Sequence, residues 1–211
     1  MLRVAIADDH PVVLKGLKEV IKEHFDDAIV DLSSRGYELL NMLTNNDYDI
    51  VLLDISLPDI SGLEVLREIR KKKRKLHVLV LSMYPEEQYA VRALKAGANG
   101  YLTKRSASDE LVQAVKQILS GKRYVTPAFA EKMVLDFESD TDLPPHETLS
   151  DRELQVLRMI GKGKSVKEMA GELHLSSNTV RTYRTRILEK IGLKGTSELI
   201  HYALTHDLTE Q

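Results

Sequence analysis

The sequence predicts an α/β domain with a doubly wound, five-stranded parallel sheet, followed by a smaller all-helical domain. Two observations predict this organisation. Over the first 120 residues, five short apolar runs alternate with longer amphipathic stretches, a rhythm typical of parallel strands joined by helices. Beyond residue 147, strand signals stop and only helix starts remain.

The five apolar runs are continuous rather than alternating, as expected for strands that helices cover on both faces. They occupy 2–7, 28–33, 49–54, 77–82 and 100–103. The amphipathic stretches predict helices near 11–24, 36–46, 62–73, 86–96 and 107–120. Proline at the start of the first helix and glycine after the fourth mark two of the boundaries.

A looser, acidic and proline-containing segment follows the last strand–helix pair. Its composition predicts a linker over 122–147, in which 127–137 can form one helix. The linker separates a first domain over 1–121 from a second over 148–211.

The second domain is predicted to contain four helices, each with a recognisable start. The first two begin with a capping box, in which a serine is followed three residues later by a glutamate. A serine and a threonine are expected to cap the other two. The starting residues are Ser150 with Glu153, Ser165 with Glu168, Ser176, and Thr196.

Composition excludes several classes of protein. The chain has 211 residues and is 43% hydrophobic, enough for packed cores, and without cysteine it forms neither disulfides nor thiolate metal sites. It carries no apolar run long enough to cross a membrane and no signal-peptide pattern at its start. We therefore expect a cytoplasmic protein with no membrane partner.

The net charge of −2 says little about nucleic acid, but its distribution says more. Residues 176–194 carry five basic side chains and one acidic one. This local excess indicates either a DNA-binding surface or a solvated helix face.

Polar side chains follow four of the predicted strands: Asp8, Asp9, Asp54, Ser82 and Lys104. In doubly wound sheets, ligands bind outside the carboxyl ends of the strands. One aspartate before His10 and Pro11 is explained as a helix cap, but two adjacent like charges call for a cation. A hard ion such as Mg²⁺ suits carboxylates. Acids, a metal, a lysine and a hydroxyl together fit phosphoryl transfer, with an aspartate as acceptor.

Four stretches, ADDH, LLDISLPDISGLE, VLVLSMY and KAGANGYLTK, closely resemble the receiver domain of bacterial two-component response regulators, over about residues 1–120. The resemblance implies a flavodoxin-like receiver fold. It implies that Asp54 accepts a phosphoryl group from a phosphohistidine on a sensor histidine kinase. It also implies Mg²⁺ bound directly by Asp9 and Asp54, through water by Asp8, and by the carbonyl of Ser56.

The same resemblance implies roles for three further residues. Ser82 and Lys104 would hold the phosphoryl oxygens, and Tyr101 occupies the family's aromatic switch position. One residue departs from the pattern: Arg105 follows Lys104 where many receivers have proline, so the isomer of that peptide bond is left open.

From Leu149 to near the C-terminus, the sequence resembles the helix-turn-helix domain of the NarL/FixJ (LuxR-type) regulators. A short turn separates the positioning helix, 165–172, from the recognition helix, 178–191. Stepping about 100° per residue predicts a buried stripe along the recognition helix. The stripe comprises Val180, Ile187 and Ile191, with Leu188 beside it.

Polar side chains on the rest of this helix are the candidate DNA contacts. We expect Arg181, Thr182 and Thr185 to face base edges, and Arg186 and Lys190 to meet phosphates. Asn178, at the start of the helix, belongs to the same set. The two threonines could instead simply face solvent. Arg184 falls on the inward side, where a pairing with Glu153 is expected.

These features predict a DNA-binding transcription regulator switched by phosphorylation, which turns over no substrate other than the phosphoryl group on its own aspartate. We expect a homodimer when the chain is phosphorylated or DNA-bound, with 196–205 as a candidate dimer face. Three alternatives remain: a phosphatase or dehalogenase, a nucleotide-binding domain, and a constitutive DNA-binding protein with a degenerate receiver. A phosphatase or dehalogenase of this kind needs a second acid at the position of Ser56. A nucleotide-binding domain needs a glycine-rich phosphate motif after a strand, and this sequence has none.

Overall fold

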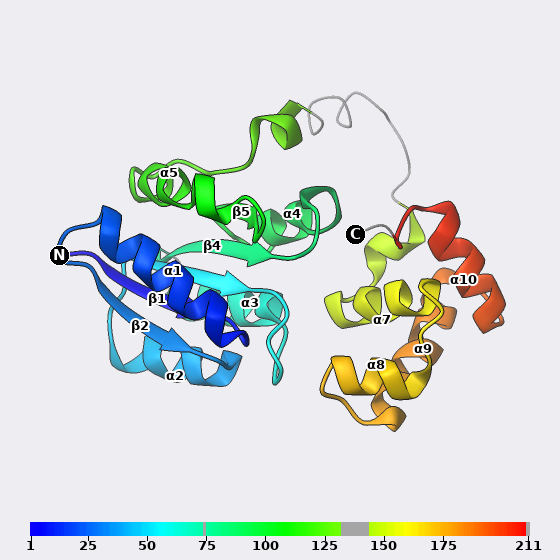
Figure 1. Cartoon of the computed structure of the whole chain (residues 1–211). Coiled ribbons are helices and arrows are strands. Elements are labelled where there is room, and N and C mark those ends of the chain that lie inside the picture. Colours follow the sequence, from blue (N-terminus) through cyan, green and yellow to red (C-terminus); the bar gives the residue numbers. More distant parts are fainter. Residues whose placement is uncertain (74, 132–143, 210–211) are drawn as a thin grey trace. The chain divides into compact units, whose positions relative to one another are not determined.

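The computed structural model describes residues 1–73, 75–131 and 144–209 (Figure 1). The chain forms two compact units, Met1–Glu138 and Ser139–Gln211.

The N-terminal unit is the predicted doubly wound sheet. Its five strands are parallel and lie in the order β2-β1-β3-β4-β5. Every predicted strand and helix is present, with ends that differ by at most one residue. The elements are β1 (Arg3–Ala7), α1 (Pro11–His24), β2 (Ile29–Ser33), α2 (Gly36–Asn45), β3 (Ile50–Asp54), α3 (Gly62–Lys72), β4 (His77–Ser82), α4 (Glu86–Lys95), β5 (Gly100–Thr103) and α5 (Ala107–Leu119).

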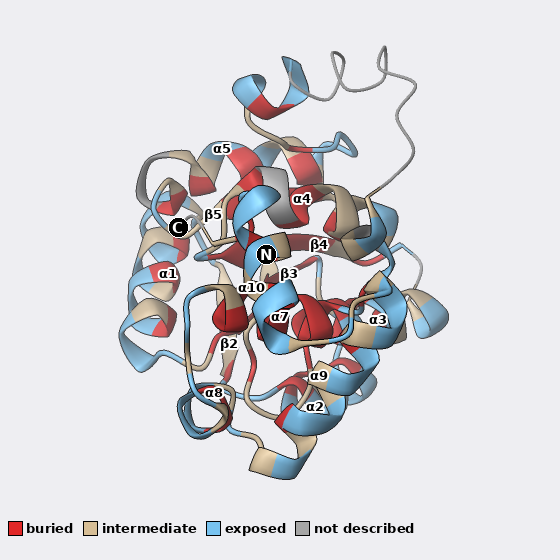
Figure 2. Cartoon of the chain, turned by 90° about the vertical axis from the view of Figure 1, so that its right-hand side faces the viewer, coloured by how far each residue is buried: buried red, intermediate tan, exposed pale blue. Residues whose placement is uncertain are grey.

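The core lies on both faces of this sheet. Helices α1 and α5 pack against one face, where their apolar residues join those of the strands in one cluster. All five residues of β3 are buried, and Figure 2 shows buried residues gathered along the central strands. Burial on both faces explains why the strand sequences are continuously apolar.

The strand register brings the carboxyl ends of β1, β3 and β4 together. Ala7 pairs with Leu53 across β1 and β3, and Asp54 pairs with Leu81 across β3 and β4. The polar residues that end these strands therefore lie at one edge of the sheet.

A glycine lets the loop after β3 turn tightly behind Asp54. A Cβ atom on Gly62 would lie 2.0 Å from the backbone oxygen of Asp54. In the same loop, the Asp59 carboxylate accepts the backbone N–H groups of Gly36 at 2.8 Å and Tyr37 at 3.0 Å. These bonds tie the loop to the first turn of α2, where a carboxylate is electrostatically favoured.

The C-terminal unit is all-helical, as predicted. It contains a short 3-10 helix η1 (Pro145–Thr148), then α7 (Asp151–Gly161), α8 (Val166–Glu172), α9 (Ser177–Ile191) and α10 (Thr196–Thr205). Both predicted capping boxes are present, and Ser176 caps α9 by accepting the N–H of Thr179 at 3.1 Å. The prediction for the last cap is wrong: Gly195 is the cap of α10, and the Thr196 hydroxyl instead accepts a bond from Arg184 on α9.

Two further predictions concern the backbone. Residues 127–131 of the predicted linker helix are helical, and the rest of that prediction, 132–137, lies outside the described residues. The Lys104–Arg105 peptide bond is trans. Across the described ranges, every helix is too short or too polar to cross a bilayer.

Two glycine-to-alanine changes test this description of the packing. Gly62→Ala should destabilise the N-terminal unit by about 2 kcal/mol or more, because its Cβ overlaps a backbone oxygen. Gly16→Ala, inside α1 with nothing within 4 Å of its Cβ, should stabilise it by about 0.5–1 kcal/mol. Urea unfolding of the full chain measures both. Equal effects of the two substitutions would contradict the close approach at Gly62.

Candidate functional site

Three carboxylates meet at the carboxyl edge of the sheet. Asp8 and Asp9 follow β1, and Asp54 ends β3. Asp8 is 1% exposed and Asp54 is 2% exposed. Ligand atoms of these three residues and of His10 all lie within 4.8 Å of one another. The structure thus brings together the acidic residues that the sequence singled out.

One ammonium group holds two of these carboxylates. Lys104 Nζ lies 2.7 Å from Asp8 Oδ2 and 2.8 Å from Asp54 Oδ2. Three carboxylates against one lysine leave a formal excess of two negative charges. A divalent cation bound by oxygen ligands would neutralise this excess, so the residues present fit Mg²⁺.

Burial opposes the ionisation of Asp54. It raises the pKa of Asp54 to about 6, even though the Lys104 ammonium pulls it down, and the nearby Asp8 carboxylate raises it further. Burial alone would lower the pKa of Lys104, but its contacts with Asp54 and Asp8 raise it above the ordinary value. The cluster is therefore under electrostatic strain that a bound cation would relieve.

His10 is the member of this cluster that sequence reasoning did not select. Its Nδ1 lies 2.6 Å from Asp9 Oδ1 and 3.2 Å from Asp8 Oδ1, and its backbone N–H donates to Asp8 Oδ1 at 2.9 Å. The signal was present in the sequence, because an imidazole directly follows two carboxylates.

Ser56 lies on the loop after β3. Its backbone N–H donates to the carboxylate of Asp54 and favours the ionised form of that group. The role of the Ser56 carbonyl as a metal ligand stays a prediction.

Ser82 and Tyr101 are both fully buried and meet at Tyr84. The Ser82 hydroxyl accepts the backbone N–H of Tyr84 at 3.1 Å. The Tyr101 hydroxyl donates to the carbonyl of Tyr84 at 2.8 Å. The Ser82 carbonyl accepts the N–H of Lys104 at 2.7 Å. The connection between β4 and α4 is thereby joined to the acidic cluster through Lys104.

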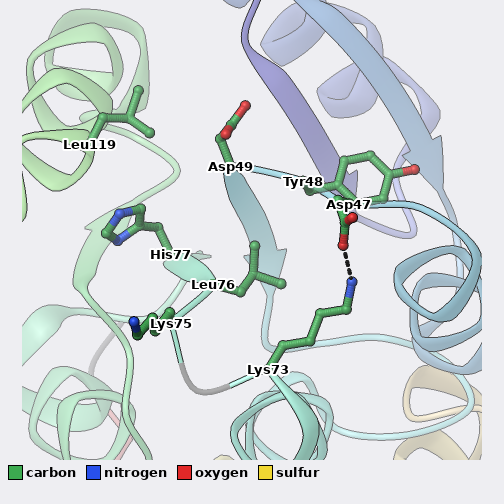
Figure 3. Close-up of a pocket in the computed structure, with 8 residues that line it drawn as sticks. All are labelled: Asp47, Tyr48, Asp49, Lys73, Lys75, Leu76, His77 and Leu119. Atoms are coloured by element: carbon green, nitrogen blue, oxygen red, sulfur yellow. Dashed lines mark hydrogen bonds and ion pairs between the residues drawn. The ribbon is translucent and has the colours of Figure 1, made fainter.

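A hollow of about 530 Å³ lies at the opposite edge of the sheet, where β3 and β4 begin (Figure 3). The Lys73 ammonium points at Asp47 there, with Nζ 2.9 Å from Oδ1. The Asp47 side chain is 98% exposed, and such surface pairs contribute little stability. None of the charged side chains that line this hollow is buried. The buried charged groups that could take part in chemistry lie instead at the carboxyl edge of the sheet.

The recognition helix α9 has the predicted division into two faces. Val180 and Ile187 are fully buried, and Leu188 and Ile191 are half-buried. The candidate DNA contacts are all exposed; these are Asn178, Arg181, Thr182, Thr185, Arg186 and Lys190.

Hydrogen bonds within α9 order part of the exposed face. Arg181 Nη1 donates to Asn178 Oδ1 at 3.1 Å. The hydroxyls of Thr182 and Thr185 donate to backbone carbonyls one turn earlier, at 3.0 and 3.2 Å. Their methyl groups and acceptor lone pairs are left for a partner.

The predicted pairing of Arg184 with Glu153 is wrong. Glu153 pairs with Lys190, whose Nζ lies 2.6 Å from Glu153 Oε2. Arg184 instead donates to Thr196 at 3.5 Å. Helical angle placed Arg184 inward, but Lys190 has a side chain long enough to reach back to the first turn of α7.

Known proteins resemble the chain along its whole length. Residues 4–116 match the response regulator receiver domain, and residues 147–203 match the luxR family of bacterial regulatory proteins. The response regulator UvrY of Escherichia coli K12 is 35% identical over 209 residues, 99% of this chain and 96% of that one. The response regulator GacA of Pseudomonas aeruginosa is 32% identical over 211 residues, 100% and 99% of the two chains.

A solved structure supports the fold. RcsB from Salmonella enterica serovar Typhimurium, bound to promoter rprA in the presence of phosphomimetic BeF₃⁻, matches with a TM-score of 0.58. The two are 24% identical, over 96% of this chain and 98% of that one.

Removing the Asp54 charge should stabilise the N-terminal unit when divalent cations are chelated. Because the folded pKa of about 6 lies above the ordinary 3.8, protonation stabilises the fold below pH 4, and this contribution is lost as the pH rises through 6. At pH 7, the free energy of unfolding of Asp54→Asn should therefore exceed that of the wild type by on the order of 3 kcal/mol.

The gap between this variant and the wild type should shrink as the pH falls through 6, and also when Mg²⁺ is added. Urea titrations at several pH values measure it. A variant less stable than the wild type at pH 7 under chelation would show that the cluster carries no such strain.

Proposed function

Because the chain belongs to the NarL/FixJ family of response regulators, with a receiver domain followed by a LuxR-type DNA-binding domain, we propose that phosphorylation of Asp54 switches its action on DNA. The observation that carries this proposal is the strained cluster of Asp8, Asp54 and Lys104. It offers a nucleophilic carboxylate, a neighbouring ammonium and a charge excess suited to one divalent cation.

The phosphoryl donor is a phosphohistidine on a sensor histidine kinase. A carboxylate oxygen of Asp54 attacks the phosphorus, the phosphorus–nitrogen bond breaks, and the departing imidazole nitrogen takes a proton. Lys104 and the Ser82 hydroxyl hold the phosphoryl oxygens. Such transfers depend mainly on positioning and charge neutralisation, which this cluster can supply.

The metal would be Mg²⁺, and the residues that would hold it are Asp8, Asp9, Asp54 and the carbonyl of Ser56, with Asp8 acting through water. When bound, it neutralises charge on the phosphoryl oxygens. The chain acts on its own aspartate and is not a turnover enzyme, because Ser56 stands where a phosphatase of this type needs a second acid.

The output is DNA binding through α9 by a homodimer in the cytoplasm. Arg181, Thr182 and Thr185 read base edges, with Asn178 bonded to Arg181, and Arg186 and Lys190 meet phosphates. The exposed side of α10 is the candidate dimer face. It carries Leu204, which is 53% exposed.

Replacing the phosphoacceptor tests the proposed function directly. Incubated with acetyl phosphate and Mg²⁺, the wild type should gain one phosphoryl group by intact-mass spectrometry, and Asp54→Asn should gain none. Asp49→Asn, which lies immediately before the first residue of the same strand, is the matched control and should label normally. A Mg²⁺-dependent adduct on Asp54→Asn would refute the assignment, and steady turnover of p-nitrophenyl phosphate would favour a phosphatase.

Two substitutions on α9 separate base reading from phosphate binding. Arg181→Ala should weaken binding to the preferred sequence by about 1–3 kcal/mol and relax the preference at one position. Arg186→Ala should weaken all sequences about equally and flatten the dependence of affinity on salt. Arg186 is chosen over Lys190 because the Lys190 ammonium also pairs with the buried Glu153. Titration against a randomised duplex library at fixed salt measures both. An unchanged preference profile for Arg181→Ala would make Arg181 a phosphate contact.

A further inference from the structure

The chain that follows α5 lies along β5 at the edge of the receiver sheet (Figure 1). Gly100 and Tyr124 form a parallel bridge. The N–H of Tyr101 donates to the Tyr124 carbonyl at 3.1 Å, and the N–H of Tyr124 donates to the Asn99 carbonyl at 2.9 Å. We call residues 122–131 the docked segment, because these bonds attach to the receiver a stretch whose composition is that of a linker.

Residues of β5 and of the docked segment both accommodate this attachment. A Cβ atom on Gly100 would lie 2.7 Å from the Tyr124 carbonyl oxygen, so glycine permits the close approach. The Tyr124 side chain is 5% exposed, and its hydroxyl donates to Glu110 Oε2 at 2.6 Å. Phe129 is 4% exposed. The docked segment therefore has its own buried anchors.

A second attachment joins the docked segment to the start of α4. The Thr126 hydroxyl donates to the carboxylate of Glu86, and the Thr126 N–H donates to the same carboxylate at 3.4 Å. Glu86 is the first residue of α4 and is 8% exposed. The Thr126 oxygen also accepts the N–H of Phe129 at 3.3 Å, at the start of the short helical stretch 127–131.

Both attachments lead back to the phosphoacceptor. Glu86 ends the connection that begins at Ser82, and the Ser82 carbonyl accepts a bond from Lys104, which pairs with Asp54. Tyr101, whose backbone bonds Tyr124, also donates its hydroxyl to the middle of the same connection. A rearrangement of residues 83–85 would therefore disturb the docked segment through its two neighbours, Glu86 and Tyr101.

We propose that the docked segment is the output element of the receiver, and that a phosphoryl group on Asp54 releases it by breaking the Glu86–Thr126 contact. This rests on the proposed function, since it requires Asp54 to be the phosphorylation site. The connection over residues 83–85 is the two-state element. Any contact present in only one of the two states biases the equilibrium between them.

Hydrogen exchange of the full chain tests the release. With Mg²⁺ and beryllofluoride as the phosphoryl stand-in, amide exchange over 122–131 should become faster, while β1 and β3 keep their protection. Binding of beryllofluoride is followed separately by fluorine NMR. Bound beryllofluoride with unchanged exchange over 122–131 overturns the release and leaves the proposed function standing. No beryllofluoride binding at all removes the proposed function and the release with it.

A substitution tests the coupling in the opposite direction. Thr126→Val removes the hydroxyl that bonds Glu86 only while the segment is docked. The substitution therefore lowers the free energy needed to release the docked segment. Coupling of sites is reciprocal, and the variant should bind beryllofluoride at fixed Mg²⁺ about 5-fold more tightly or better. Thr126→Ser, which keeps the hydroxyl, should restore the wild-type affinity.

The matched control removes a hydroxyl hydrogen bond close to the docked segment but outside it. The Ser120 hydroxyl donates to the Gln117 carbonyl at 2.7 Å, at the end of α5, and this bond is unaffected by release of residues 122–131. Ser120→Ala should therefore leave the beryllofluoride affinity unchanged. An unchanged affinity in Thr126→Val, or an equal gain in Ser120→Ala, overturns the proposed route through Glu86.

Discussion

The crowding of three carboxylates around one buried ammonium is the constraint on which the receiver depends. Lys104 pairs with Asp8 and Asp54, yet burial still leaves the pKa of Asp54 raised. An arrangement with this much uncompensated negative charge costs free energy when it stands alone. A bound divalent cation would relieve this cost, and the same cation would offset the negative charge that a phosphoryl group brings.

The surrounding fold holds this strained arrangement in place. Parallel pairing aligns the ends of β1, β3 and β4, and Gly62 lets the next helix begin directly behind Asp54. The Asp59 bonds to α2 hold the intervening loop. Stability supplied by the fully buried strand β3 and its neighbours offsets the cost of the cluster, as is common at functional sites.

Local patterns predicted most of this, and long-range contacts account for what they missed. Apolar runs, capping boxes and the Asp8–Asp9 pair are visible in short stretches, so the strands, the helix starts and the acidic cluster could be predicted. The pairing of Lys190 with Glu153 depends on how α9 packs on α7. The docking of Tyr124 and Thr126 depends on bonds to residues far back in the chain. Composition alone predicts that this segment is a linker, because its own sequence does not indicate which distant residues it contacts.

Locating the cation is the most direct test of the claim that the carboxyl edge is the functional site. Mn²⁺ titrated into the full chain broadens the NMR signals of nearby amides, and it prefers oxygen ligands as Mg²⁺ does. Broadening should begin at the amides around Asp8, Asp9, Asp54 and Ser56, and excess Mg²⁺ should reverse it. Broadening that centres instead on Asp47 and Asp49, at the opposite edge of the sheet, would contradict the account.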